Sequence, residues 1–237
     1  MTSGHTGCSS VWHTAMEVRD GYIVGIYNYC DGWCDRCAFT SYCQVFADKC
    51  EMEAALDPSM SAVAEAPFHR EEIRSRPRTA DAHMRGVPRD VPERDAIGRR
   101  SDEYLRRTYA WLQRSDRGDA RDHHDDPRAV ISWFHLMIHV KTMRALRGLE
   151  EDDPADRDWP SDHDGAAKVA LIGIDRSYTA WLDLVEVGAV STVEATPFLD
   201  DLLWLRGAIE HTFPKARAFV RPAFDEPDAV ARLLHGG

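Results

Sequence analysis

The sequence predicts a mainly α-helical protein, a helical bundle with a small N-terminal β-hairpin and a cysteine-rich segment. Helical patterns dominate residues 101–237, a tight-turn dipeptide follows a short run near the N-terminus, and five of the six cysteines fall within residues 30–50. Helices joined by short to medium connections typically pack as a bundle. We therefore expect three parts: a cysteine-rich segment over residues 1–56, an irregular proline-rich wrapping linker over 57–100, and a helical domain over 101–237.

The hairpin is predicted around Asp20-Gly21, which is a favoured two-residue turn. The run that follows, residues 22–27, is rich in β-branched and aromatic side chains, which are typical of strands. We expect the second strand to lead directly to Cys30.

A helix is predicted after the cysteines, because Ser41 and Gln44 have the spacing of a capping box. This helix should run to about Leu56. Cys43 and Cys50 lie seven residues apart on it, which is two helical turns, so they share one face.

Residues 57–100 are polar and contain five prolines without a sustained period, which indicates irregular structure. Four helical patterns come after this segment. They begin at Ser101, at Pro127 (to about Leu146), at Gly165 (to about Val187) and at Pro197 (to about Phe213).

Charge and hydropathy exclude several classes of function. Lys and Arg number 29 against 40 Asp and Glu, a net charge of -11, which disfavours a surface that follows nucleic-acid phosphates. No apolar run approaches the roughly 20 residues that span a bilayer, and the first residues do not resemble a secretory signal. We therefore expect a cytoplasmic protein with no membrane or nucleic-acid partner. Much of the excess acidity falls in residues 150–164, where we expect a solvated acidic loop.

The cysteines carry the strongest chemical signal. Cys30, Cys34, Cys37 and Cys43 are spaced C-x3-C-x2-C-x5-C. Closely spaced thiolates of this kind are typical ligands of an iron–sulfur cluster, and we expect a 4Fe-4S cluster here. Zinc is the alternative. A structural zinc site usually has two C-x2-C-like knuckles, and here only Cys34 and Cys37 form a standard one. A disulfide framework suits short secreted chains better than a chain of 237 residues without an export signal.

The two remaining cysteines are weaker candidates. Cys50 could replace Cys43 as a ligand, but an ordinary core thiol is the favoured interpretation. Cys8 lies in a Gly- and Ser-rich start, where we expect little structure.

A second metal site is conceivable within the helices. His135 and His139 stand at i and i+4 in an apolar stretch, so both imidazoles leave one helical face. A bundle could add Asp175 and Glu210 to them, giving ligands for iron, manganese or zinc, or the two histidines could bind haem. The alternative is an ordinary buried polar network, with Lys168 or Arg176 as compensating charges. No Glu is followed three residues later by His, so the pattern of ferritin-like di-iron bundles is absent.

The stretch over residues 27–43 resembles the N-terminal cysteine signature of a group of uncharacterised bacterial proteins, written YNYCDxWCxRCxFTSxC. The resemblance implies that the cysteine segment and the helical body belong together, and it implies no activity.

Three functional hypotheses follow. The first is a redox or electron-transfer protein whose iron–sulfur cluster packs on the helical domain and serves a redox partner protein. The second is a bundle metalloenzyme, with His135 and His139 as ligands and structural metal at the cysteines. The third is a zinc-stabilised, non-enzymatic interaction module whose acidic loop binds a basic partner.

Overall fold

The fold was obtained as a computed structural model, which describes residues 17–56, 93–114, 126–151 and 162–226. Cys8, residues 57–92 of the expected linker and residues 152–161 of the expected acidic loop lie outside the described residues.

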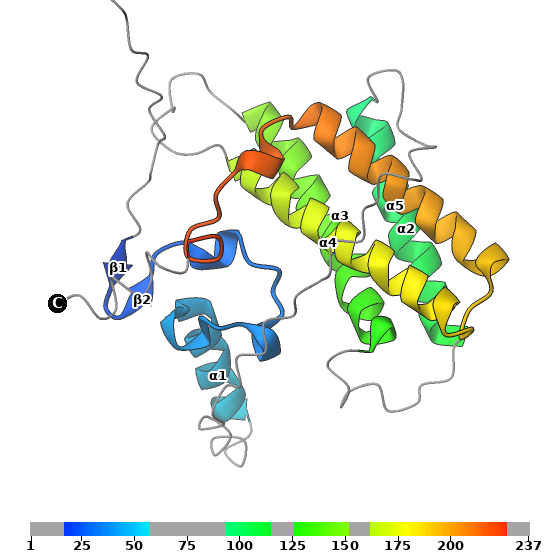
Figure 1. The fold of residues 1–237 in the computed structure, drawn as a ribbon. Coiled ribbons are helices and arrows are strands. Elements are labelled where there is room, and N and C mark those ends of the chain that lie inside the picture. The colour runs from blue at the N-terminus through cyan, green and yellow to red at the C-terminus, as the bar shows by residue number, and fades with distance from the viewer. Residues whose placement is uncertain (1–16, 57–92, 115–125, 152–161, 227–237) are drawn as a thin grey trace, which may run out of the picture.

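The described residues confirm the mainly helical fold with a small N-terminal hairpin. Four long helices form the body (Figure 1): α2 (Arg94–Arg114), α3 (Pro127–Glu151), α4 (Asp162–Glu186) and α5 (Thr192–Thr212). The α3 and α4 helices pack on each other, α2 contacts α3 and α5, and α5 contacts α4. Within the described ranges, no helix is long and apolar enough to cross a membrane.

The bundle core follows from helical periodicity in the sequence. On α2, the residues that reach the core recur every three or four positions, so they occupy one face. They are Ile97, Ser101, Tyr104, Thr108 and Trp111. At the far end of the bundle, Trp181 stacks on Phe198 with ring centroids 4.2 Å apart and lies 4.6 Å from Trp111. Large aromatic surfaces buried this way supply much of the energy that holds helices together.

Three helices, α2, α4 and α5, begin earlier than expected. The α2 helix starts at Arg94, so residues 94–100 are helical and not irregular. The α5 helix starts at Thr192, because the Ser191 side chain accepts a hydrogen bond from the Glu194 N–H at 3.2 Å and caps the first turn. Pro197 therefore lies inside α5 and does not open it.

Asp164 also departs from the expectation of a solvated acidic loop. It lies in the first turn of α4, and the residue is 7% exposed. The helix begins at Asp162, so the last residues of the acidic stretch are helical.

The N-terminal hairpin is shorter than expected. It pairs β1 (Val18–Arg19) with β2 (Tyr22–Ile23), antiparallel. Asp20 and Gly21 have φ of 52° and 85°, the positive values that a type I′ turn requires. The strand ends at Ile23, and a 3-10 turn, η1 (Ile26–Asn28), leads to Cys30 instead.

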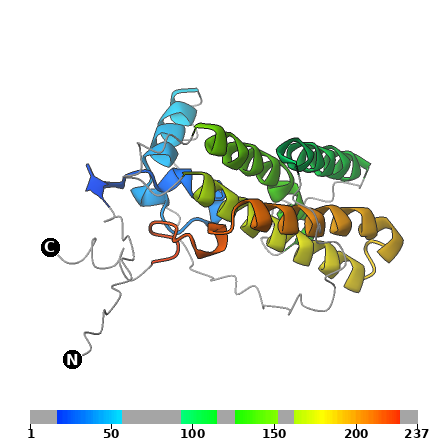
Figure 2. The same ribbon diagram turned by 90° about the horizontal axis from the view of Figure 1, so that it is seen from above.

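The short helix α1 (Gln44–Leu56) follows the cysteines, but not through the expected capping box. Ser41 lies inside a 3-10 turn, η3 (Thr40–Tyr42), and the first α1 amides, of Phe46 and Ala47, bond to the Cys43 carbonyl. In Figures 1 and 2 α1 stands apart from the four-helix body, and none of its residues is buried.

Candidate functional site

Four cysteines line one pocket in the cysteine segment, which we define as residues 26–46. Cys30 follows η1, Cys34 begins the 3-10 turn η2 (Cys34–Arg36), Cys37 ends that turn, and Cys43 lies between η3 and α1. All four are partly buried and line the same pocket. Three tight turns in succession bring these residues together, because each turn reverses the chain within a few residues. The structure therefore gathers the four cysteines that the spacing singled out.

The rest of the pocket wall is mainly apolar. Ile26, Trp33, Phe39 and Phe46 come from the cysteine segment, and Phe224 comes from near the other end of the chain. A lining of this kind excludes water from whatever the pocket holds and lowers the local dielectric constant. The site thus combines soft sulfur atoms with a dry environment.

Backbone groups hydrogen-bond to two of the sulfur atoms. The Phe39 N–H donates a hydrogen bond to Cys37 Sγ at 3.4 Å, and Cys30 Sγ donates one to the Tyr27 carbonyl at 3.2 Å. Gly32 has a φ of +74°, which glycine adopts without strain and which lets the chain curl back toward Cys30. An amide donor such as that of Phe39 stabilises a thiolate, whether it is free or bound to a metal.

The free thiols are nevertheless held in their protonated form. Burial raises the pKa of Cys30 and Cys34, and it raises the pKa of Cys37 to about 11 despite the Phe39 amide. Electrostatic interaction among the cysteines acts in the same direction. Because the thiolate is the nucleophile, thiols with raised pKa are poor catalytic nucleophiles. A metal can displace their protons, and its charge would then compensate the clustered negative sulfurs.

The described cysteines are all free thiols, with no disulfide between any two of them. Within the described ranges, no group of three or more His, Cys, Asp or Glu side chains is arranged to hold a metal ion. Cys50 is exposed on α1 and does not line the pocket.

The pocket rests on the helical body through Asp31 and Trp33. Asp31 Oδ2 accepts a hydrogen bond from Arg176 at 2.8 Å, and its carbonyl accepts one from Trp133 Nε1 at 3.0 Å. Trp33, which is 8% exposed, stacks on Trp133 with ring centroids 5.2 Å apart. Three residues before Asp31, the Asn28 carbonyl accepts a hydrogen bond from Lys141 Nζ at 2.8 Å. These contacts fix the cysteine turns against α3 and α4.

The residues of the expected second site have other partners. Arg217 binds Asp175 at 2.6 Å and Glu210 at 2.8 Å. His139 Nδ1 lies 2.9 Å from the Ser101 hydroxyl, and His135 Nδ1 lies 2.6 Å from the Ser132 carbonyl. Burial lowers the pKa of His135, which favours its neutral form.

Two charged residues on α4 have partners that the sequence does not reveal. Lys168 and Arg176, expected as compensating charges for the histidines, instead reach Asp225 and Asp31 respectively. Their spacing of eight residues, about two turns, places them on one face of α4. That periodicity was visible in the sequence, whereas the identity of the segments that cover this face was not.

No protein-family model matches this sequence, and neither a curated protein nor a solved structure is significantly similar to it.

Proposed function

We propose that the chain binds a 4Fe-4S cluster through Cys30, Cys34, Cys37 and Cys43 and uses it for electron transfer or another redox task. One observation carries this proposal: the four cysteines with cluster-like spacing line a single, mainly apolar pocket. Iron–sulfur clusters are held by four cysteine thiolates, and both burial and hydrogen bonds to sulfur set their potential.

The cysteine spacing supports a cluster over a single zinc ion. Structural zinc sites usually combine two knuckles, and Cys34 and Cys37 form the one standard knuckle in this segment. Runs of closely spaced cysteines are typical of iron–sulfur ligation.

The number of thiols favours electron transfer over substrate binding. Four cysteines would occupy every iron corner and leave no open coordination position for a substrate. The amide donor at Cys37 would delocalise charge from the reduced cluster and raise its potential. Trp33 touches both the pocket and Trp133 on α3, which gives an electron a short route toward the helical body.

The small core of the cysteine segment also supports a bound group. It consists of buried Ile23, Ile26 and Ala223, with partly buried aromatic neighbours, and α1 contributes no buried residue. So small a core contributes little stability on its own. A cluster that joins four points of the segment would add the missing stabilisation, as structural metals do in other small modules.

The test is elemental analysis of the full chain purified or reconstituted without oxygen. We expect about four iron and four sulfide per chain, with broad visible absorption that bleaches on reduction. Each of C30S, C34S, C37S and C43S should lose most of the iron. C50S is the matched control and should keep it, because Cys50 lies outside the pocket.

Two results would reject the proposal. Colourless protein with one zinc per chain would assign the same cysteines to a structural zinc site. Iron that survives all four substitutions, or that C50S removes equally well, would place the metal elsewhere.

A further inference from the structure

A short C-terminal segment forms one side of the cysteine pocket. We call residues 219–226 the cover. Phe224 of the cover lines the pocket and meets Phe39 edge to face, with ring centroids 5.1 Å apart. Ala223 is fully buried beside Ile23 and Ile26. The chain therefore uses residues nearly two hundred positions away from the cysteines to complete the wall of their pocket.

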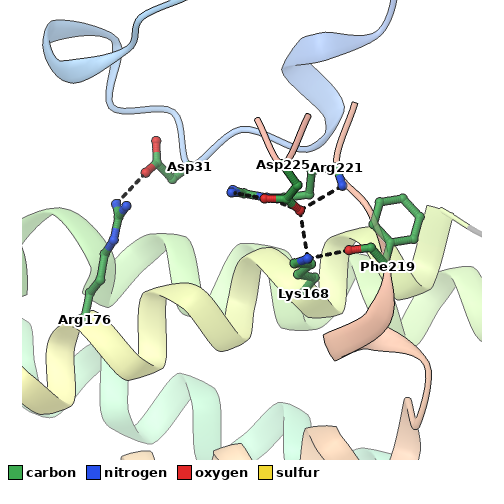
Figure 3. A network of polar contacts seen from close by, with 6 residues as sticks. All are labelled: Asp31, Lys168, Arg176, Phe219, Arg221 and Asp225. Atoms are coloured by element: carbon green, nitrogen blue, oxygen red, sulfur yellow. Dashed lines mark hydrogen bonds and ion pairs between the residues drawn. The ribbon is translucent and has the colours of Figure 1, made fainter. Parts of the chain in front are cut away.

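The contacts of the cover with the cysteine segment are apolar, whereas a polar cluster ties it to the helical body. Lys168 Nζ lies 2.7 Å from Asp225 Oδ2 and also donates a hydrogen bond to the Phe219 carbonyl (Figure 3). Arg221 binds the same carboxylate through its side chain at 2.8 Å and its backbone N–H at 2.9 Å. One lysine on α4 thus holds both ends of the cover.

The closed cover contains one strained residue. Ala223 has a φ of +69°, in the left-handed region that costs a residue with a side chain about 1–2 kcal/mol. It sits between Arg221 and Asp225, where the polar contacts converge. The strained conformation persists because its surroundings hold it, so weakening those contacts favours release of the cover.

We propose that residues 219–226 are a gate over the cysteine pocket and that the Lys168–Asp225 contact keeps the gate closed. The role of the gate rests on the proposed function, because a buried cluster needs a route by which iron and sulfide reach the thiols. The gating itself concerns the apoprotein and can be measured without any metal.

The experiment measures alkylation of the reduced, full-length apoprotein by iodoacetamide, followed by peptide mass spectrometry. The rates at Cys30, Cys34 and Cys37 are each divided by the rate at Cys50, which is exposed and outside the pocket. When opening is rare and closing is fast, such a ratio follows the population of the open state.

We expect K168M to raise the ratio roughly tenfold, because a charge-assisted hydrogen bond shifts an opening equilibrium by about this factor. D225N should act in the same direction. The K168M/D225N double variant should be slower than the product of the two single effects predicts, because both single variants remove the Lys168–Asp225 contact. The matched control is R217M, which breaks the ion pairs to Asp175 and Glu210 just before the cover and should leave the ratio unchanged.

Three outcomes would overturn the gate. The first is an unchanged ratio in K168M and D225N. The second is an equal acceleration at Cys50, which indicates general loosening. The third is an R217M ratio as high as that of K168M.

If K168M does not fold, D225N and F224A still test the gate. F224A removes part of the pocket wall and should expose the same cysteines. A chain that binds no cluster would reject the proposed function and leave the alkylation ratios valid.

Discussion

Arg176 on α4 binds Asp31, the residue that follows Cys30 in the cysteine segment. Arg176 Nη1 lies 2.8 Å from Asp31 Oδ2. Asp31 Oδ1 accepts a further hydrogen bond from the Trp33 N–H at 3.1 Å. The same carboxylate therefore shapes the turn between Cys30 and Cys34 and attaches it to the helical body.

Replacing Arg176 should loosen this attachment. R176M should lower the free energy of unfolding by about 0.5–1 kcal/mol, a modest value because the arginine is 44% exposed and solvent screens the pair. It should also increase the rate at which the reconstituted protein loses iron. Thermal unfolding and iron release to a chelator measure the two effects.

The matched control for that prediction is R106M. Arg106 pairs with Asp102 within α2, and the arginine is 78% exposed, so its loss should change neither quantity. Equal effects of R176M and R106M would contradict a specific role for Arg176.

Comparing alanine substitutions at Gly32 and Gly21 separates the effect of backbone strain from the effect of contact with the helical body. Both have positive φ, +74° and +85°, so alanine is strained at either position. A Cβ on Gly32 would lie 2.9 Å from Met137 Cε on α3, whereas a Cβ on Gly21 meets nothing within 4 Å. We expect G21A to cost about 1 kcal/mol and G32A slightly more, about 1.5 kcal/mol, because Met137 Cε is the end of a flexible side chain and can shift.

Denaturant unfolding of the two variants checks this difference. G32A should also reduce the iron content after reconstitution, because Gly32 shapes the turn at Cys30, while G21A should leave it unchanged. Equal losses of stability would mean that Met137 yields readily and that Gly32 does not fix the docked position.

Asp225 should make stability depend on pH in acid. Burial opposes ionisation, but hydrogen bonds from Arg221 and Lys168 lower the pKa of Asp225 to about 2 from 3.8. The folded state therefore binds this proton less readily than the unfolded chain. The stabilisation is fully present above about pH 4 and is lost as the pH falls toward 2.

The measurement is the difference in unfolding free energy between wild type and D225N at several pH values. The difference should be about 1 kcal/mol larger at pH 6 than near pH 2, after allowance for solvent screening. Taking the difference removes the other carboxylates, which titrate in both proteins. A difference independent of pH would contradict the polar cluster at Asp225.

The cap of α5 provides a test confined to the helical body. S191A should lower the free energy of unfolding by about 1 kcal/mol, because the Glu194 N–H loses its acceptor. The iron content should stay unchanged, since Ser191 is in the bundle and does not line the pocket. Circular dichroism melts and iron analysis check the two halves of this prediction, and a loss of iron in S191A would contradict it.

The helices and the cysteine cluster could be predicted because both depend on local sequence. Apolar residues every three or four positions indicate a helix wherever they occur, and Asp20-Gly21 indicates a hairpin turn without distant partners. The ends of the helices are harder to predict, because local signals for a helix start can compete. The Ser191 and Glu194 capping pair was present in the sequence, but Pro197 suggested a later start, and the structure accommodates that proline inside the helix.

The partners of the charged side chains could not be predicted, because each partner comes from a distant part of the chain. Sequence patterns suggested that Asp175 and Glu210 could approach two histidines, whereas Arg217 binds both carboxylates. Likewise, nothing near Phe224 indicates that its ring belongs to the cysteine pocket. Such contacts depend on how the helices pack and where the chain returns.

Local patterns are enough to predict a helical body, a short hairpin and four cysteines at cluster-like spacing, because short-range geometry and residue chemistry specify these. Only the packed fold shows that the four thiols share one mainly apolar pocket, that Asp31 and Trp33 anchor it to α3 and α4, and that Lys168 contacts the C-terminal cover beside it. Burial and long-range contacts arise only when the helices pack, so they are properties of the folded chain.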